Sequence, residues 1–169
     1  MSQDLARIFR QVDKDHSGYI GPGELYQALS QGVWRPFNME TVRMMVVMYD
    51  RDGNGVIDFN EFRVLWTALT QWRQVFMSYD LDRSGRISKS ELINCLSQMG
   101  YRLSDRFYNL IYAKFDRTRT GQLTFDDFIP VCITLQTLTY VFAAVDIQRR
   151  GVITISYETF LSMVVGTRI

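Results

Sequence analysis

The sequence predicts an all-α protein with about eight helices, arranged as an array of five helix-loop-helix units. The first observation behind this prediction is that short acidic loops recur along the chain, starting at Asp13, Asp50, Asp80, Asp116 and Asp146. The second is that the segments between the loops carry apolar residues at helical spacing. The third is that the eighth position of every loop is branched and apolar, which favours short β pairings between loops. We treat residues 1–169 as one domain, with loops at 13–24, 50–61, 80–91, 116–127 and 146–157.

Helix-ending signals divide the chain into pairs of units. Gly32, Pro36 and Asn38 lie between loops one and two, and Gly100 and Ser104 lie between loops three and four. Such residues end one helix and cap the next. The two other intervals carry no such break, so each predicts one continuous helix shared by two units, at residues 59–79 and 125–145. Pro130 falls within the second of these and can be accommodated in its first turns.

The eighth-position residues predict which loops pair. Ile20 would pair with Ile57, and Ile87 with Leu123, which couples loop one to loop two and loop three to loop four. Ile153 of the fifth loop has no partner within the chain. An unpaired strand and the apolar run at 157–165 would be costly to expose, so we expect a dimer formed through the fifth unit.

Loops one, two and three have the pattern of a calcium-binding EF-hand loop. Oxygen-bearing side chains stand at positions 1, 3 and 5, a glycine at position 6 and a glutamate at position 12. Calcium takes six to eight oxygens, and a short loop surrounds it only by turning sharply at the glycine and closing with a bidentate glutamate. The predicted ligands, with Tyr19, Val56 and Arg86 contributing their carbonyls, are Asp13, Asp15, Ser17, Tyr19 and Glu24; Asp50, Asp52, Asn54, Val56, Asp58 and Glu61; and Asp80, Asp82, Ser84, Arg86 and Glu91.

Loops four and five depart from this pattern. Loop four has Thr118 and Thr120 at positions 3 and 5, and the shorter Asp127 closes it. It would bind calcium weakly at best, or Mg²⁺ instead. Loop five places Arg150 where a ligand belongs and Tyr157 at position 12, so we expect a structural unit that holds no metal.

The rest of the composition excludes several classes of function. Formal net charge is +1 with no basic block, which argues against nucleic-acid binding. The only histidine is His16 at an outward-facing loop position, and no catalytic or zinc-binding set is present, so we predict no enzyme. Cys95 and Cys132 are expected as free thiols. We find no secretory signal and no apolar run that looks long enough to cross a bilayer, so we expect a cytoplasmic protein.

Several short segments resemble the penta-EF-hand family over nearly the whole chain. These segments are Phe9–Asp15, Trp34–Asn38, Gly100–Asp105, Lys114–Arg117 and Ser156–Glu158. The resemblance implies a calcium-dependent adaptor that dimerises through its fifth hand, as a homodimer or with a related chain. It also implies that the loaded protein binds Pro- and Tyr-rich segments of partners in vesicle trafficking, with peripheral membrane association through those partners and locations that include the nucleus and endoplasmic reticulum or endosomal membranes.

Carried over residue by residue, the family's peptide groove would involve Trp66, Trp72, Met99 and Tyr157. Met99 stands where a relative carries phenylalanine, which would alter peptide preference. Taken singly, such aromatic and methionine residues are more often part of a core. Two alternatives to the adaptor remain open: a passive calcium buffer, and a regulatory subunit of a calpain-like protease. A sensor would bind a hydrophobic dye when calcium is added, whereas a buffer would barely respond.

Overall fold

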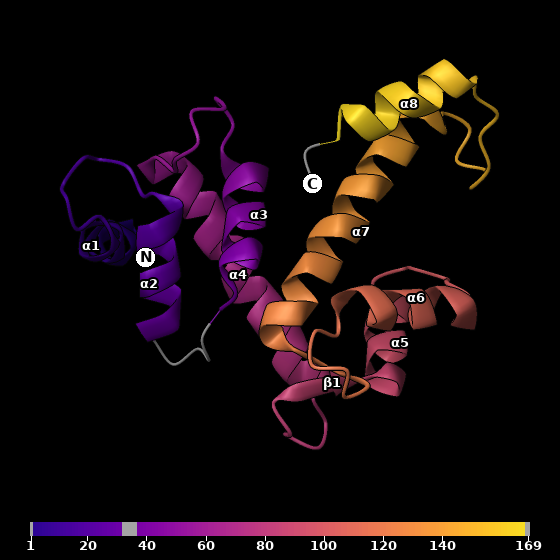
Figure 1. The fold of residues 1–169 in the computed structure, drawn as a ribbon, viewed down its shortest axis with the longest axis horizontal. Helices are drawn as coiled ribbons and strands as arrows, with labels where there is room; N and C mark the ends of the chain where they lie inside the picture. Colours follow the sequence, from indigo (N-terminus) through magenta and orange to yellow (C-terminus); the bar gives the residue numbers. More distant parts are fainter. Residues whose placement is uncertain (1, 32–36, 168–169) are drawn as a thin grey trace.

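Eight helices and one two-stranded ribbon form the part of the chain that the structure describes, residues 2–31 and 37–167 of a computed structural model (Figure 1). Gly32 and Pro36 lie outside these residues. The elements are α1 (Ser2–Val12), α2 (Pro22–Gln31), α3 (Met39–Tyr49), α4 (Phe59–Tyr79), β1 (Arg86–Ser88), α5 (Lys89–Gln98), α6 (Asp105–Phe115), β2 (Gln122–Thr124), α7 (Phe125–Val145) and α8 (Tyr157–Val165). The all-α prediction and the two long shared helices, α4 and α7, are confirmed.

The loops themselves start the helices that follow them. The Asp58 side chain accepts a hydrogen bond from the Glu61 amide, and the Glu61 side chain accepts one from the Asp58 amide. Ser88 and Glu91 make the same reciprocal pair at the start of α5. This capping box satisfies amide groups that have no partner within the helix. The carboxylate at position 12 therefore serves both as a predicted metal ligand and as a helix cap.

Helix α5 ends where the sequence predicts it to end. Gly100 has φ of 91°, in the left-handed region that glycine enters without steric cost. The Tyr101 amide then donates to the Leu96 carbonyl at 2.9 Å, which closes the helix end. Ser104 caps α6 by accepting from the Phe107 amide.

Paired loops join the hands two by two. Ile20 and Ile57 form an antiparallel bridge, with N–O distances of 2.8 and 2.9 Å. β1 pairs antiparallel with β2, and Ile87 lies opposite Leu123. All four of these apolar side chains are fully buried. The predicted pairing of loop one with two and of loop three with four is confirmed.

The fifth hand stands apart from the other four. Within the described residues its loop forms no strand, and α8 buries none of its residues. Figure 1 shows α8 at the far end of α7, away from α5 and α6. Its exposed apolar side chains include Tyr157, Phe160, Leu161, Val164 and Val165. This surface is the one from which the sequence predicts a dimer.

Helix α7 is long and apolar, and its first half is buried. By length and composition it is apolar enough to cross a membrane, which corrects our expectation that no run is. Core helices of globular proteins can have the same length and composition, and residues 127–133 are all buried within the protein. Pro130 lacks an amide hydrogen and so leaves the Asp126 carbonyl without its helical donor. The Thr41 hydroxyl of α3 lies 3.4 Å from that carbonyl and donates to it instead.

Candidate metal centres

All five loops share one backbone shape. Position 4 has positive φ in each, between 52° and 57° at His16, Arg83, Arg119 and Arg149 and 74° at Gly53. Position 6 is a glycine with φ between 71° and 83° in every loop. Side-chain-bearing residues enter this region at a cost, so something in the loop must hold it there. The shared shape includes loops four and five, which lack the full ligand pattern.

The aspartate at position 1 holds this backbone. Asp13 accepts hydrogen bonds from the amides of Ser17 and Gly18, both at 3.0 Å. Asp146 of loop five does the same with the amides of Arg150 at 3.0 Å and Gly151 at 2.7 Å. These bonds are made within the protein, so each loop is formed by its own side chain and amides.

Three clusters of carboxylates meet in loops one to three. Within each cluster the ligand oxygens lie within 4.8 Å of one another: Asp13, Asp15 and Glu24; Asp50, Asp52 and Glu61; Asp80, Asp82 and Glu91. Two oxygens that both touch calcium at about 2.3–2.6 Å are at most about 5 Å apart, so these clusters have the size of a calcium shell. The predicted carboxylate ligands of loops one to three are therefore brought together, except Asp58, whose side chain caps α4 instead of joining the cluster of loop two.

Backbone amides orient the closing glutamate in all three loops. Glu24 accepts from the amides of Lys14 and Gly21, one at each carboxylate oxygen and both at 2.9 Å. Glu61 accepts in the same way from Arg51 and Asp58, and Glu91 from Leu81 and Ser88. In Glu24 and Glu61 each oxygen keeps a second lone pair for a cation, whereas one oxygen of Glu91 also accepts from the Ser88 hydroxyl at 2.7 Å. Position 12 is thus fixed in place from two sides, as second contacts commonly fix metal ligands.

Hydrogen bonds also keep several of these carboxylates in the charged form that calcium needs. Those from Ser17 lower the pKa of Asp15, and those from Ser84 lower the pKa of Asp82. Burial raises the pKa of Glu91, but hydrogen bonds from Ser88 and the Leu81 amide outweigh it, so the net pKa is lowered. These ligands are ionised at neutral pH, and protons do not compete with a metal there.

Loops four and five lack such a cluster among the described residues. In loop four the guanidinium of Arg117 contacts Asp127, the carboxylate at position 12. In loop five the Arg150 amide binds Asp146, and Tyr157 at position 12 is 76% exposed. The geometry therefore separates three complete metal loops from two incomplete ones.

The four residues of the expected peptide groove lie in different surroundings. Trp72 is buried, with its ring 6.4 Å from that of Tyr49, and Trp66 is half-buried against Phe62. Met99 is 40% exposed at the end of α5, and Tyr157 is exposed at the start of α8. In this conformation Trp72 belongs to the core, so a peptide would reach it only after the helices move.

Sequence reasoning missed a polar contact at the centre of the molecule. Asp126 lies in the first turn of α7, and its side chain accepts from the backbone amide of Asn38 at 2.9 Å and pairs with Arg117. A cavity of about 670 Å³ lies beside this contact, walled by Phe37, Phe76 and Phe125 among others. Asn38 and Asp126 are far apart in the chain, and no local pattern in the sequence indicates that they meet.

Five helix-loop-helix hands, three of which hold complete carboxylate clusters, define an EF-hand calcium-binding protein. The family model "EF-hand domain pair" matches residues 2–67 and 69–133. The chain is 46% identical to peflin from Mus musculus over 92% of its length and 42% identical to sorcin from Homo sapiens over 88% of its length. A solved structure of a homolog of programmed cell death 6 protein from Leishmania major Friedlin is 36% identical, with a TM-score of 0.83 over 97% of this chain and 94% of that one. The chain belongs to the penta-EF-hand family.

The relatives differ in how much of their length the chain matches. It spans 57% of the mouse peflin, but 76% of the human sorcin and 94% of the sorcin from Schistosoma japonicum, to which it is 45% identical. The chain therefore spans little more than half of mouse peflin and most of the two sorcins.

Proposed function

We propose that this protein is a calcium sensor and adaptor, which binds calcium through loops one to three and then captures Pro- and Tyr-rich segments of partner proteins. One observation carries the proposal: two of the complete loops, two and three, stand at opposite ends of the same helix, α4. Because α4 has a metal loop at each end, calcium binding at either loop would change the position of the helix and of the residues along it. Trp66 and Trp72 lie on that helix.

The sites would act by drawing the closing glutamate and the entering aspartates onto one ion. Calcium binding in sensor EF-hands changes the angle between the helices of a hand and exposes an apolar groove. In this protein we propose that such a movement would expose the buried Trp72 and the half-buried Trp66. Met99, at the end of α5, is the third residue of the proposed groove. Mg²⁺ is proposed only as an occupant of the weaker sites.

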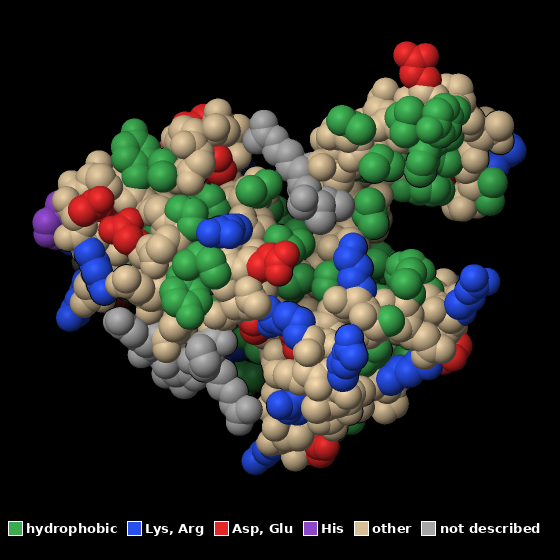
Figure 2. All heavy atoms as spheres, viewed as in Figure 1, with side chains coloured by type: hydrophobic (Ala, Val, Ile, Leu, Met, Phe, Trp, Pro, Cys, Tyr) green, Lys and Arg blue, Asp and Glu red, His purple; other side chains and the backbone are tan. Residues whose placement is uncertain are grey.

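The fifth hand supports a second part of the proposal, a homodimer or a heterodimer with a related chain. Figure 2 shows green apolar side chains gathered over α8, at the upper right of the view. Val152 of the unpaired loop is 74% exposed and Phe160 is 51% exposed. A second fifth hand has a matching edge and a matching apolar helix, so it would cover both at once.

The proposed setting follows from the proposed partners. A non-enzymatic adaptor of this kind would work in the cytoplasm, in the nucleus or at endoplasmic reticulum and endosomal membranes, held there by the proteins it binds. A passive buffer and a regulatory subunit of a calpain-like protease are the competing functions, and the exposed α8 would equally serve the heterodimer that the second of these requires.

Titrating a Pro/Tyr-rich peptide into the protein by calorimetry, with calcium and then with chelator, tests the sensor proposal. We expect binding only with calcium, and we expect Trp66→Ala to weaken it by about 10-fold or more, since hot-spot tryptophans commonly contribute about 2 kcal/mol or more. The same peptide with alanine at its tyrosines is the control ligand. Equal binding in chelator, or none in either condition, would contradict the proposal and favour the buffer or the protease subunit.

A further inference from the structure

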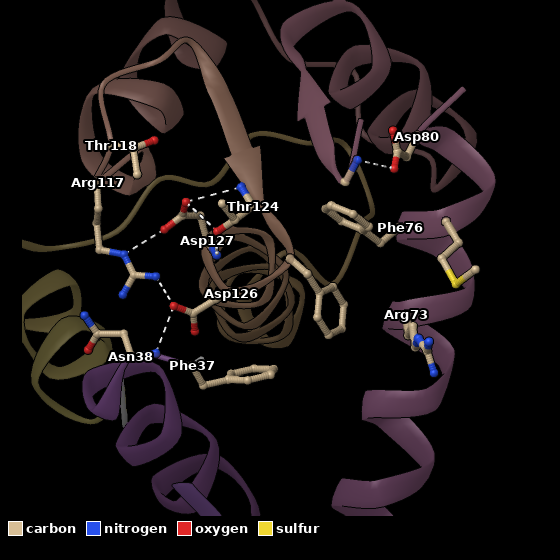
Figure 3. Close-up of a pocket in the computed structure, with 13 residues that line it drawn as sticks. Phe37, Asn38, Arg73, Phe76, Asp80, Arg117, Thr118, Thr124, Asp126 and Asp127 are labelled. Atoms are coloured by element: carbon tan, nitrogen blue, oxygen red, sulfur yellow. Dashed lines mark hydrogen bonds and ion pairs between the residues drawn. The ribbon is translucent and has the colours of Figure 1, made fainter. Parts of the chain in front are cut away.

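The closing carboxylate of loop four is held by a side-chain cation. Asp127 accepts a hydrogen bond from Nε of Arg117 at 2.7 Å, and its other oxygen accepts from the amide and hydroxyl of Thr124 at 3.2 and 2.8 Å (Figure 3). In loops one to three the carboxylate at position 12 takes the backbone amide of position 2 instead. Aspartate is one methylene shorter than glutamate, so in loop four the position 2 side chain, Arg117, extends to meet it.

A second guanidinium covers the other ligand positions of loop four. Nη1 of Arg86 lies 3.4 Å from the hydroxyl of Thr118 and 3.2 Å from that of Thr120. These threonines stand at positions 3 and 5, where calcium loops place oxygen ligands. Thr118 in turn donates to Asp116 at 3.0 Å. Two guanidinium groups thus bring two positive charges to a loop in which a divalent ion would bring two.

Arg117 also ties loop four to the first half of the molecule. Its Nη2 pairs with Asp126, and the same carboxylate oxygen of Asp126 accepts from the Asn38 amide, which precedes α3. Figure 3 shows Arg117 between Asp126 and Asp127, with Asn38 on the far side of Asp126. The Thr41 hydroxyl reaches the Asp126 carbonyl that Pro130 leaves without a helical donor. The Asp127 side chain is 1% exposed and that of Asp126 is 12% exposed, so both need a partner for their charge.

We propose that Arg117 is the resident cation of loop four: with Arg86 it takes the place of a metal ion, so that hand four and its junction with α3 keep their geometry with or without calcium. Hand four then gives a fixed reference against which the hands that bind calcium move. The inference goes beyond the sensor proposal, because it holds whichever partner the loaded protein binds.

Melting the full-length protein in excess chelator tests the first half of this inference. Arg117→Met leaves two buried carboxylates without their cation, and we expect the melting temperature to fall by about 5–10 °C, given the usual cost of breaking a partly buried ion pair. The matched control is Arg119→Met, which removes the same charge from an exposed position of the same loop. A melting temperature for Arg117→Met within about 1 °C of the control would overturn the inference.

Amide hydrogen exchange at Asn38 tests the second half, because a general loss of stability would not single out this amide. In the natural sequence we expect Asn38 to be equally protected in calcium and in chelator. In Arg117→Met the protection of the Asn38 backbone amide should fall by about 10-fold or more relative to the amides of α3. In Arg119→Met this protection should stay unchanged. Loss of Asn38 protection on removing calcium from the natural sequence, or full protection in Arg117→Met, would show that the junction does not depend on Arg117.

Discussion

Alanine at both Glu24 and Glu91 will abolish the calcium response of the protein. Each glutamate is the predicted bidentate ligand of its loop and is positioned by two backbone amides, so we expect no neighbouring side chain to replace it. We expect the calcium affinity of loops one and three to fall by on the order of 100-fold. This is about the difference between the dissociation constants of sensor sites and of weak extracellular sites, which ligand charge helps to set. Calcium calorimetry gives the number of sites lost, and fluorescence of a hydrophobic dye gives the response.

The control for this pair is Glu40→Ala with Glu158→Ala, which removes the same charge from exposed positions outside the calcium loops' ligand sets. We expect that control to keep its full number of sites and its dye response. If Glu24→Ala with Glu91→Ala still bound a partner peptide in chelator as the natural sequence does in calcium, the sensor proposal would be wrong.

Ile153→Asp with Phe160→Asp is expected to prevent formation of the proposed dimer at micromolar concentration. Ile153 is the unpaired eighth-position residue of loop five, and Phe160 lies on α8, where no residue is buried within the chain. A charge in the centre of an apolar interface costs about 2 kcal/mol or more at a hot spot, so we expect the dimer to weaken by at least about 30-fold. Light scattering coupled to size-exclusion chromatography measures the mass directly.

Leu110→Asp provides the comparison for this double variant, because Leu110 is an apolar residue 59% exposed on α6, away from the fifth hand. It should remain dimeric. A natural sequence that is monomeric at micromolar concentration would end the proposal of self-association and leave α8 as a surface for a different chain.

The features that the sequence predicts well are those that depend on residues close together in the chain. The twelve-residue pattern from Asp80 to Glu91 predicts the loop and its glycine turn, because both depend on contacts within one unit. The partners of Ile20 and Ile87 were also predictable, because hands pair in order along the chain.

Contacts between distant segments were beyond the sequence. Nothing near Asp126 indicates that its carboxylate binds Asn38 or that Thr41 supplies the donor missing at Pro130. The burial of Trp72 depends on how α3 packs on α4 and could not be separated from an exposed groove position by spacing alone. Our expectation that no run is apolar enough to cross a membrane overlooked α7, which reaches that hydropathy although residues 127–133 are buried within the protein.

The internal hydrogen bonds of Asp13 and its counterparts bear on how quickly the protein follows a calcium pulse. A loop that already has its shape needs no slow refolding before an ion enters, so capture proceeds at a rate set by diffusion, on the order of 10⁸–10⁹ M⁻¹s⁻¹. Differences in affinity between loops one, two and three would then appear almost entirely in their release rates. At a dissociation constant of about 1 μM, release takes roughly 1–10 ms. A loop of this kind would empty between closely spaced pulses, and partners that bind more slowly would respond only to sustained calcium.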